Sequence, residues 1–287
     1  MKYFKLIGIL IFVYILSGLD YELAYESVAS LKLSYVLIYC FSFFVFFLLK
    51  AYRWHLIQTH FSKPLKFREN LWLQIETVYL SYVTPGKLGD IAKLWIMKSE
   101  FGIDKKDSIF AYFFDRLQDL MLLLFFSIIS LFFIIDIDVS NYLYIFLICL
   151  LCLYFIKNHI VRFVDKRIKI TTLPKIKLFF ELKLLTLSLV IFAVFFFQVL
   201  MLSKAIGLNI DYLFIVALMS ISSLAVLIPI SIGGLGVREG VYVYMLSTIG
   251  VTSEDSVILS LLDNLVFLTV FIVILHLFSK FHLRKML

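Results

Sequence analysis

Charged residues are scarce in this chain. Asp, Glu, Lys and Arg together make up 16% of its 287 residues, whereas a soluble globular domain is nearer a quarter charged. The hydrophobic share is 62% and the mean hydropathy is +1.01. These values exclude a water-soluble enzyme and predict one integral membrane domain over 1–287, with no length left for a soluble catalytic domain. Proline is also scarce (4 residues) and no low-complexity tract is visible, which excludes a disordered chain.

Cysteine and histidine give no sign of a metal or redox centre. Cys149 and Cys152 form a C-x-x-C, but Leu, Ile and Tyr surround them without a nearby His or acid, which favours packing thiols. The five histidines have no metal-ligand spacing. We therefore expect no metal and no cofactor. The N-terminal apolar run has no small-residue cleavage signal after it, so it indicates a first membrane span.

Uncharged runs give the expected spans. A spanning helix needs roughly 17–25 predominantly apolar residues, and flanking lysines such as Lys5 and Lys50 can extend a shorter run by snorkelling. Six segments qualify: Leu6–Leu19, Leu33–Leu49, Leu120–Ile135, Val139–Ile156, Leu184–Ser203 and Ser256–Ser279.

Two further apolar segments are interrupted by proline and glycine. Leu71–Met97 is broken over 84–90, and Tyr212–Gly250 is broken over 229–236. Broken backbone at membrane depth persists only where protein or a wet cavity covers it. The sequence thus predicts an all-α polytopic membrane protein, with about six spanning helices and two re-entrant broken hairpins that enter from opposite faces.

The basic residues are distributed unevenly between the two expected sides. The proposed cytoplasmic parts, among them the segment with Lys50 and Arg53, hold 21 of the 27 Lys and Arg, and the proposed outer loops hold only Lys32 and Lys204. This bias predicts both termini on the cytoplasmic side of an inner membrane. It also explains the net charge of +7 as a topology signal, so we expect no nucleic-acid partner.

The chain also contains a weak internal repeat. Superposing Leu88-Gly89 on Leu235-Gly236 shifts the chain by 147 residues, and nearly the same shift brings 114–117 onto 262–265. Each half then has two spans, one broken hairpin and one span with a polar marker. Because the halves start on opposite sides, the sequence predicts an inverted repeat with halves of approximately 1–138 and 139–287, and paired broken segments point to a transport site near the midplane.

The first broken segment is a candidate headgroup site. Its tip, 84–90, combines backbone N–H groups at a helix start with Lys87, and Lys93 follows one turn later. This combination suits an anion. The alternative is a plain cytoplasmic turn whose lysines face anionic lipid.

Asp115, Arg116 and Asp119 precede a long uncharged run. Arg116 and Asp119 share a helix face and can pair, and ionisable groups within a span normally face the interior. The guanidinium of Arg116 is suited to holding a phosphate through two hydrogen bonds. The alternative is a span that begins later and leaves these residues at the interface.

The second tip, 233–240, has glycines but neither the spacing nor the βαβ context of a dinucleotide loop. Arg238 and Glu239 at this depth pair or face a cavity. Asp263 and Asn264 lie in the last span, where a site role and interhelical hydrogen bonding both remain open.

These motifs together resemble the lysylphosphatidylglycerol synthase transmembrane family, a flippase-like membrane domain found alone or fused to an aminoacyl-lipid synthase domain. The resemblance covers nearly the whole chain and is carried by three ordered motifs: Thr84-Pro85-Gly86-Lys87-Leu88-Gly89-Asp90, Asp115-Arg116-x-x-Asp119 and Pro229-x-x-x-Gly233-Gly234-Leu235-Gly236-Val237-x-Glu239. It implies an inner-membrane protein that handles anionic or polyprenyl-linked lipids. The family more often has Arg and Glu where this chain has Lys87 and Asp90, and often an Arg near Asn264.

Two functions from different classes follow. The first is a flippase-like transporter that translocates or binds an anionic phospholipid or a polyprenyl-phosphate-linked glycolipid. The second is a non-transporting partner that presents lipid to a separate glycosyl- or aminoacyl-transferase, and an integral-membrane transferase is a third possibility. No residue is assigned a catalytic role. The expected lipid-binding residues are Thr84, Pro85, Gly86, Lys87, Gly89, Asp90, Lys93, Asp115, Arg116, Asp119, Pro229, Gly233, Gly234, Gly236, Arg238, Glu239, Asp263 and Asn264.

Overall fold

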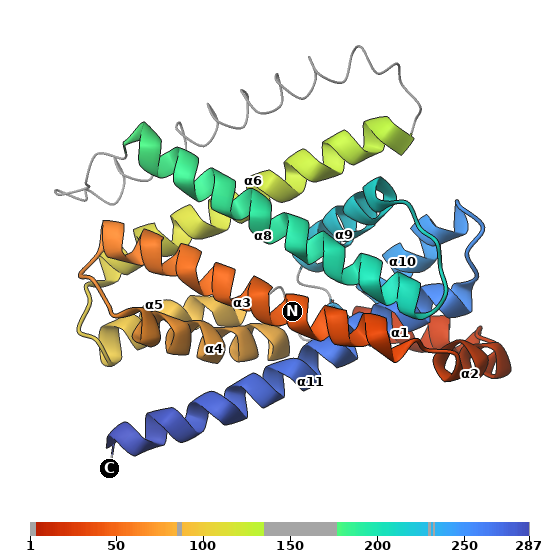
Figure 1. Cartoon of the computed structure of the whole chain (residues 1–287), viewed down its shortest axis with the longest axis horizontal. Helices are drawn as coiled ribbons and strands as arrows, with labels where there is room; N and C mark the ends of the chain where they lie inside the picture. The colour runs from red at the N-terminus through yellow and green to blue at the C-terminus, as the bar shows by residue number, and fades with distance from the viewer. Residues whose placement is uncertain (1–3, 85–87, 135–176, 229–230, 232, 287) are drawn as a thin grey trace.

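The computed structural model of the chain describes residues 4–84, 88–134, 177–228, 231 and 233–286 (Figure 1). Over these residues the secondary structure is entirely helical, with ten α-helices, one 3₁₀ helix and no strand. The all-α prediction is therefore confirmed for this part of the chain. The helices are α1 (Phe4–Ser17), α2 (Tyr21–Ala29), α3 (Leu33–Phe61), α4 (Phe67–Val83), η1 (Leu88–Ile91), α5 (Ala92–Ser99), α6 (Lys105–Ile134), α8 (Leu178–Ala205), α9 (Tyr212–Val226), α10 (Val237–Ser247) and α11 (Ser253–Met286).

Three of the described helices are long and apolar enough to cross a membrane: α3, α8 and the part of α11 over Ser253–His276. One more crossing results if Gly8–Ser17 and Tyr21–Ala29 form one span, although these two pieces meet at a bend of 92°. The membrane class is confirmed, and the number of six spans stays a prediction. The expected span Val139–Ile156, with Cys149 and Cys152, lies outside the described residues.

The first expected span, Leu6–Leu19, nearly coincides with α1, and a second helix follows it directly. Asp20 accepts hydrogen bonds from the backbone N–H groups of Glu22 (2.9 Å) and Leu23 (3.4 Å), so its side chain caps α2. Gly8–Ser17 and α2 meet at a bend of 92°, and this second helix was not predicted.

Helix α3 is longer than the apolar run that predicted it. The run ends at Leu49, but the helix continues to Phe61 because no glycine or proline interrupts the intervening residues. Helix α6 likewise begins at Lys105, well before Leu120. Asp115, Arg116 and Asp119 therefore lie within a long helix, and α3 carries Lys50 and Arg53 toward them.

Both broken segments form helix pairs. Helix α4 packs against η1 and α5, and α9 packs against α10. Gly89 closes the first pair: it is buried, and a Cβ there would overlap the carbonyl group of Leu80 on α4. Figure 1 shows α4 and α5 at the left of the molecule and α9 and α10 at the right, with α3, α6, α8 and α11 running between them.

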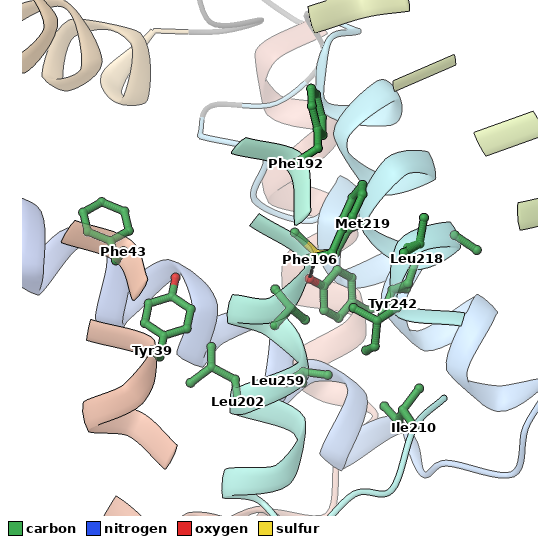
Figure 2. Packing of buried hydrophobic residues seen from close by; sticks show 14 of the residues in the cluster. Tyr39, Phe43, Phe192, Phe196, Leu202, Ile210, Leu218, Met219, Tyr242 and Leu259 are labelled. Carbon is green, nitrogen blue, oxygen red and sulfur yellow. Dashed lines mark hydrogen bonds between the residues drawn. The ribbon is translucent and has the colours of Figure 1, made fainter. Parts of the chain in front are cut away.

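The core between these helices is rich in aromatic side chains. Figure 2 shows Tyr39 and Phe43 on α3 near Phe192 and Phe196 on α8, with Met219 and Tyr242 beyond them. The Tyr242 hydroxyl lies 3.0 Å from the Met219 sulfur. Because lipid tails are as apolar as these side chains, ring packing and interhelical hydrogen bonds, not exclusion of water, hold such helices together.

Candidate functional site

A cavity of about 420 Å³ lies between α3, α4, α6, α8, α9 and α11. Much of its wall is aromatic, with six phenylalanines: Phe43, Phe46, Phe47, Phe192, Phe195 and Phe267. Charged side chains from both halves of the sequence also line it. With the side chains that pair with them, they form two groups, which we call the Arg116 cluster (Lys50, Arg53, Asp90, Asp115, Arg116 and Asp119) and the Arg238 cluster (Tyr39, Arg238, Asp263 and Asn264).

Arg116 joins the first hairpin to α6. Its Nη1 lies 2.9 Å from Asp90 Oδ2, and its Nη2 lies 2.6 Å from Asp115 Oδ2 and 3.5 Å from Asp119 Oδ2. The predicted pairing of Arg116 with Asp119 is therefore present, although Asp90 and Asp115 are the closer partners. The side chain of Arg116 keeps 28% of its surface exposed, so a ligand in the cavity can reach it.

Arg53 was not expected in the site. The sequence assigned it to the cytoplasmic basic residues, but its side chain is 1% exposed and lies behind Asp115 and Asp119. Its Nη2 is 2.9 Å from Asp115 Oδ1 and 2.6 Å from Asp119 Oδ1, and its Nη1 donates to Ser188 on α8 at 3.1 Å. Arg53 thus ties α3, α6 and α8 together and neutralises two carboxylates whose other cationic partners, Arg116 and Lys50, are more exposed.

The Arg238 cluster joins the second hairpin to α11. Arg238 Nη1 donates to Asn264 Oδ1 at 2.6 Å and lies 3.2 Å from Asp263 Oδ2. Tyr39 on α3 donates to the other Asp263 oxygen at 2.7 Å. The hydroxyl of Tyr39 and the guanidinium therefore hold Asp263 from two sides, and all four side chains line the cavity.

Glu239 does not line the cavity, in contrast to the adjacent Arg238. It is fully buried, accepts the backbone N–H of Gly236 at 2.6 Å and accepts from Ser260 at 3.0 Å. These bonds close a cap at the start of α10. Gly236 has φ +81°, and a Cβ there would overlap the carbonyl of Gly8 on α1. Both residues shape the second tip from behind the cavity wall.

The structure brings together half of the predicted site residues around the cavity. Those that line it are Thr84, Asp90, Arg116, Asp119, Gly233, Gly234, Arg238, Asp263 and Asn264. Those described but absent from its wall are Gly89, Lys93, Asp115, Gly236 and Glu239. Those outside the described residues are Pro85, Gly86, Lys87 and Pro229.

Seven further polar residues of the cavity wall were missed: Tyr39, Lys50, Gln74, Ser81, Gln198, Ser222 and Ser223. For Lys50 and Arg53 a signal was available, because they are three residues apart in a helix-compatible stretch and share one face with Trp54 nearby. Tyr39, Gln74 and Gln198 stand alone in apolar segments, where a sequence offers no reason to prefer them over packing residues.

The comparison with known families identifies the class of the chain. The family model of the lysylphosphatidylglycerol synthase TM region matches residues 5–275. The described helices and this match define an integral membrane protein of a class linked to lipid handling. The chain belongs to the lysylphosphatidylglycerol synthase TM region family. A search of curated proteins matched none of them.

Proposed function

We propose that this protein is a flippase-like membrane protein that binds and translocates a lipid with a phosphate-containing headgroup, either an anionic phospholipid or a polyprenyl-phosphate-linked glycolipid. The observation that carries the proposal is one cavity that combines Arg116, Arg238 and Lys50 with a wall of phenylalanines. Guanidinium groups hold phosphate through paired hydrogen bonds, and the phenylalanine rings suit hydrocarbon chains.

The ion pairs around Arg116 and Arg238 make binding reversible. Each arginine already has a carboxylate partner, Asp90 at 2.9 Å and Asp263 at 3.2 Å. A lipid phosphate therefore exchanges with a carboxylate instead of filling a vacant site, so part of the binding energy offsets the lost pair. Weak binding of this kind suits a transporter, whose substrate must leave as readily as it enters.

The order of the helices is consistent with the inverted repeat that this proposal includes, and such a repeat would support movement between leaflets. A long helix, a helix pair with a break, and another long helix follow each other twice, as α3 to α6 and as α8 to α11. Under this proposal the halves are approximately 1–138 and 139–287, six spans cross the inner membrane, and both termini are cytoplasmic. The two hairpins then enter from opposite faces and their tips meet at the lipid path.

A leaflet-resolved assay tests translocation. Purified protein in proteoliposomes with fluorescent phosphatidylglycerol should move the probe between leaflets. Arg116→Lys should slow this at least tenfold, because lysine keeps the charge but loses the paired donors. Lys98→Gln, at an exposed position outside the cavity, is the matched control and should transport normally. Binding without leaflet movement would assign the presenting role, and turnover with a soluble donor would assign a transferase.

Topology is tested separately by cysteine labelling in intact cells. A cysteine in place of Glu254 should react with an impermeant reagent, and one in place of Lys105 should be protected. The reverse pattern would overturn the proposed orientation while leaving the cavity assignment intact.

A further inference from the structure

The side-chain amide of Gln74 on α4 is held in one orientation by a hydrogen bond from Lys93. Its side chain lines the cavity although the residue is only 4% exposed. Its Oε1 accepts a hydrogen bond of 2.6 Å from Lys93 Nζ. A lysine ammonium has donors and no acceptor, so the carbonyl oxygen, not the NH₂ group, must face Lys93. The two donors of the Gln74 amide consequently point away from Lys93.

Lys93 is itself held in place. It lies on α5, is fully buried, and its Nζ sits 4.5 Å from the centre of the Trp54 ring. A cation over an indole face is electrostatically favourable. Lys93 does not line the cavity, but its ammonium group holds the side chain of Gln74, which does.

The Gln74 Nε2 donates to no residue that the structure describes, and it is not one of the fully buried unpaired atoms. Gln198 on α8 lines the same cavity and is 3% exposed, and its Nε2 is a fully buried donor without a partner in the described part of the chain. A buried donor without an acceptor is destabilising. This donor, together with the Gln74 amide hydrogens that point away from Lys93 at the same cavity, indicates that an occupant supplies acceptors.

We infer that Gln74, positioned by Lys93, donates its amide hydrogens to an acceptor oxygen of the bound lipid, next to the phosphate held by Arg116 and Lys50. This inference rests on the proposed function. The acceptor chemistry is an oxygen of either the phosphate or an ester carbonyl of a glycerolipid. Gln74 is then a specificity-determining residue that recognises an acceptor oxygen of the lipid, and Lys93 is a positioning residue.

Binding of phosphatidylglycerol to the purified full-length protein in detergent tests the inference. In the double variant Gln74→Met with Lys93→Met, an unbranched apolar pair replaces the polar pair, so no buried cation is left without its partner. We expect about tenfold weaker binding than in the wild type, because the variant loses one hydrogen-bonded group. Gln118→Met is the matched control, because Gln118 is buried in α6 and does not line the cavity. Thermal unfolding of each variant checks that it is folded.

Two arms refine the result. Lys93→Met alone leaves the Gln74 donors in place but frees the amide to rotate, so we expect about threefold weaker binding, on the order of half the energy of one net hydrogen bond. Wild-type affinity in this variant would overturn the positioning role. Diether phosphatidylglycerol, which lacks ester carbonyls, identifies the acceptor: a loss confined to the diester lipid assigns the carbonyl, and an equal loss for both lipids assigns the phosphate.

The failures are distinguishable. If the wild type binds phosphatidylglycerol and the folded double variant binds both lipids as tightly as the wild type does, the Gln74 inference is wrong and the proposed function stands. If the wild type binds neither phosphatidylglycerol nor its diether analogue, the anionic-phospholipid form of the proposed function and the Gln74 inference are both overturned.

Discussion

The Arg116 and Arg238 clusters each connect a hairpin to the long helix that follows it, with their charges exchanged. In the first, the hairpin supplies the carboxylate of Asp90 and α6 supplies the guanidinium, 2.9 Å apart. In the second, the hairpin supplies the guanidinium and α11 supplies the carboxylate of Asp263, 3.2 Å apart. An ion pair across this junction holds hairpin and helix together whichever side carries the cation, because the attraction depends only on the product of the charges.

The clusters differ in how the surrounding charges are balanced. Around Arg116, the buried Arg53 and the half-buried Lys50 share Asp115 and Asp119 with it, so α3 contributes two cations. Around Arg238 the additional partners are neutral: Asn264 accepts a hydrogen bond from the guanidinium, and Tyr39 donates one to the Asp263 carboxylate. Removing one member should therefore cost more in the Arg116 cluster, where a lost cation exposes carboxylates to one another.

The largest effect is expected for Arg53→Met. Asp115 and Asp119 would keep Arg116 but lose their buried partner, and removing one member of a buried ion pair costs about 3–5 kcal/mol in the free energy of unfolding. Denaturant unfolding of the protein in detergent measures this. Asn264→Leu is the comparison in the other cluster and should cost about 1 kcal/mol. Equal losses would remove the difference between the clusters.

The next effect concerns the glycines that close the two hairpins. Gly236→Ala should destabilise by about 3 kcal/mol, because the added methyl overlaps the Gly8 carbonyl and also occupies a left-handed backbone position. Gly89→Ala should cost about 1–3 kcal/mol from overlap with Leu80 alone. Gly250→Ala is the control: it has φ +79° with nothing within 4 Å of a Cβ, so only the backbone cost of about 1–2 kcal/mol applies. Thermal unfolding ranks the three.

Exchanging charges sharpens the comparison directly. Arg238→Asp and Asp263→Arg should each destabilise by about 1–3 kcal/mol, and the double variant should recover more than half of the sum, because the ion pair is restored in reverse. The same exchange at Asp90 and Arg116 should not recover, since Asp115 and Asp119 would then face a further carboxylate. Melting temperatures of the six variants decide it. Recovery in both clusters would mean that repulsion between Asp115, Asp119 and the new carboxylate contributes little to the free energy of unfolding.

The smallest effect is expected for Lys50→Met. Its Nζ lies 3.5 Å from Asp119 Oδ2 and its side chain is 24% exposed, so the pair is worth at most about 1 kcal/mol. Lys50 and Arg53 share the Asp119 carboxylate but differ in burial, which makes them a matched pair. A loss for Lys50→Met as large as that for Arg53→Met, measured by the same unfolding assay, would show that burial does not set the difference.

Much of the local structure could be predicted from the sequence. Apolar runs identified α3, α8 and α11, and proline with glycine identified both helix breaks, since these residues act on the backbone within a few positions of themselves. Asp115, Arg116 and Asp119 lie within the long helix α6, and their position inside a membrane span stays a prediction, based on the cost of ionisable groups in a bilayer. The helix α2 after the bend was missed, because Asp20, Glu22 and Glu26 led us to expect an outer loop there.

The sequence alone determined the class of the protein: a membrane-embedded helical chain with two broken helices and a few ionisable residues placed among apolar ones. Composition and hydropathy suffice for this, because the bilayer imposes helical hydrogen bonding on any long apolar segment. Only the tertiary structure decided which charges meet. Arg53 and Asp115 are 62 positions apart, and Tyr39 and Asp263 are 224 apart. Such contacts depend on how whole helices pack, and neither the identity nor the spacing of the residues encodes that packing locally. The cavity, and the orientation that Lys93 gives to Gln74, follow from the same packing.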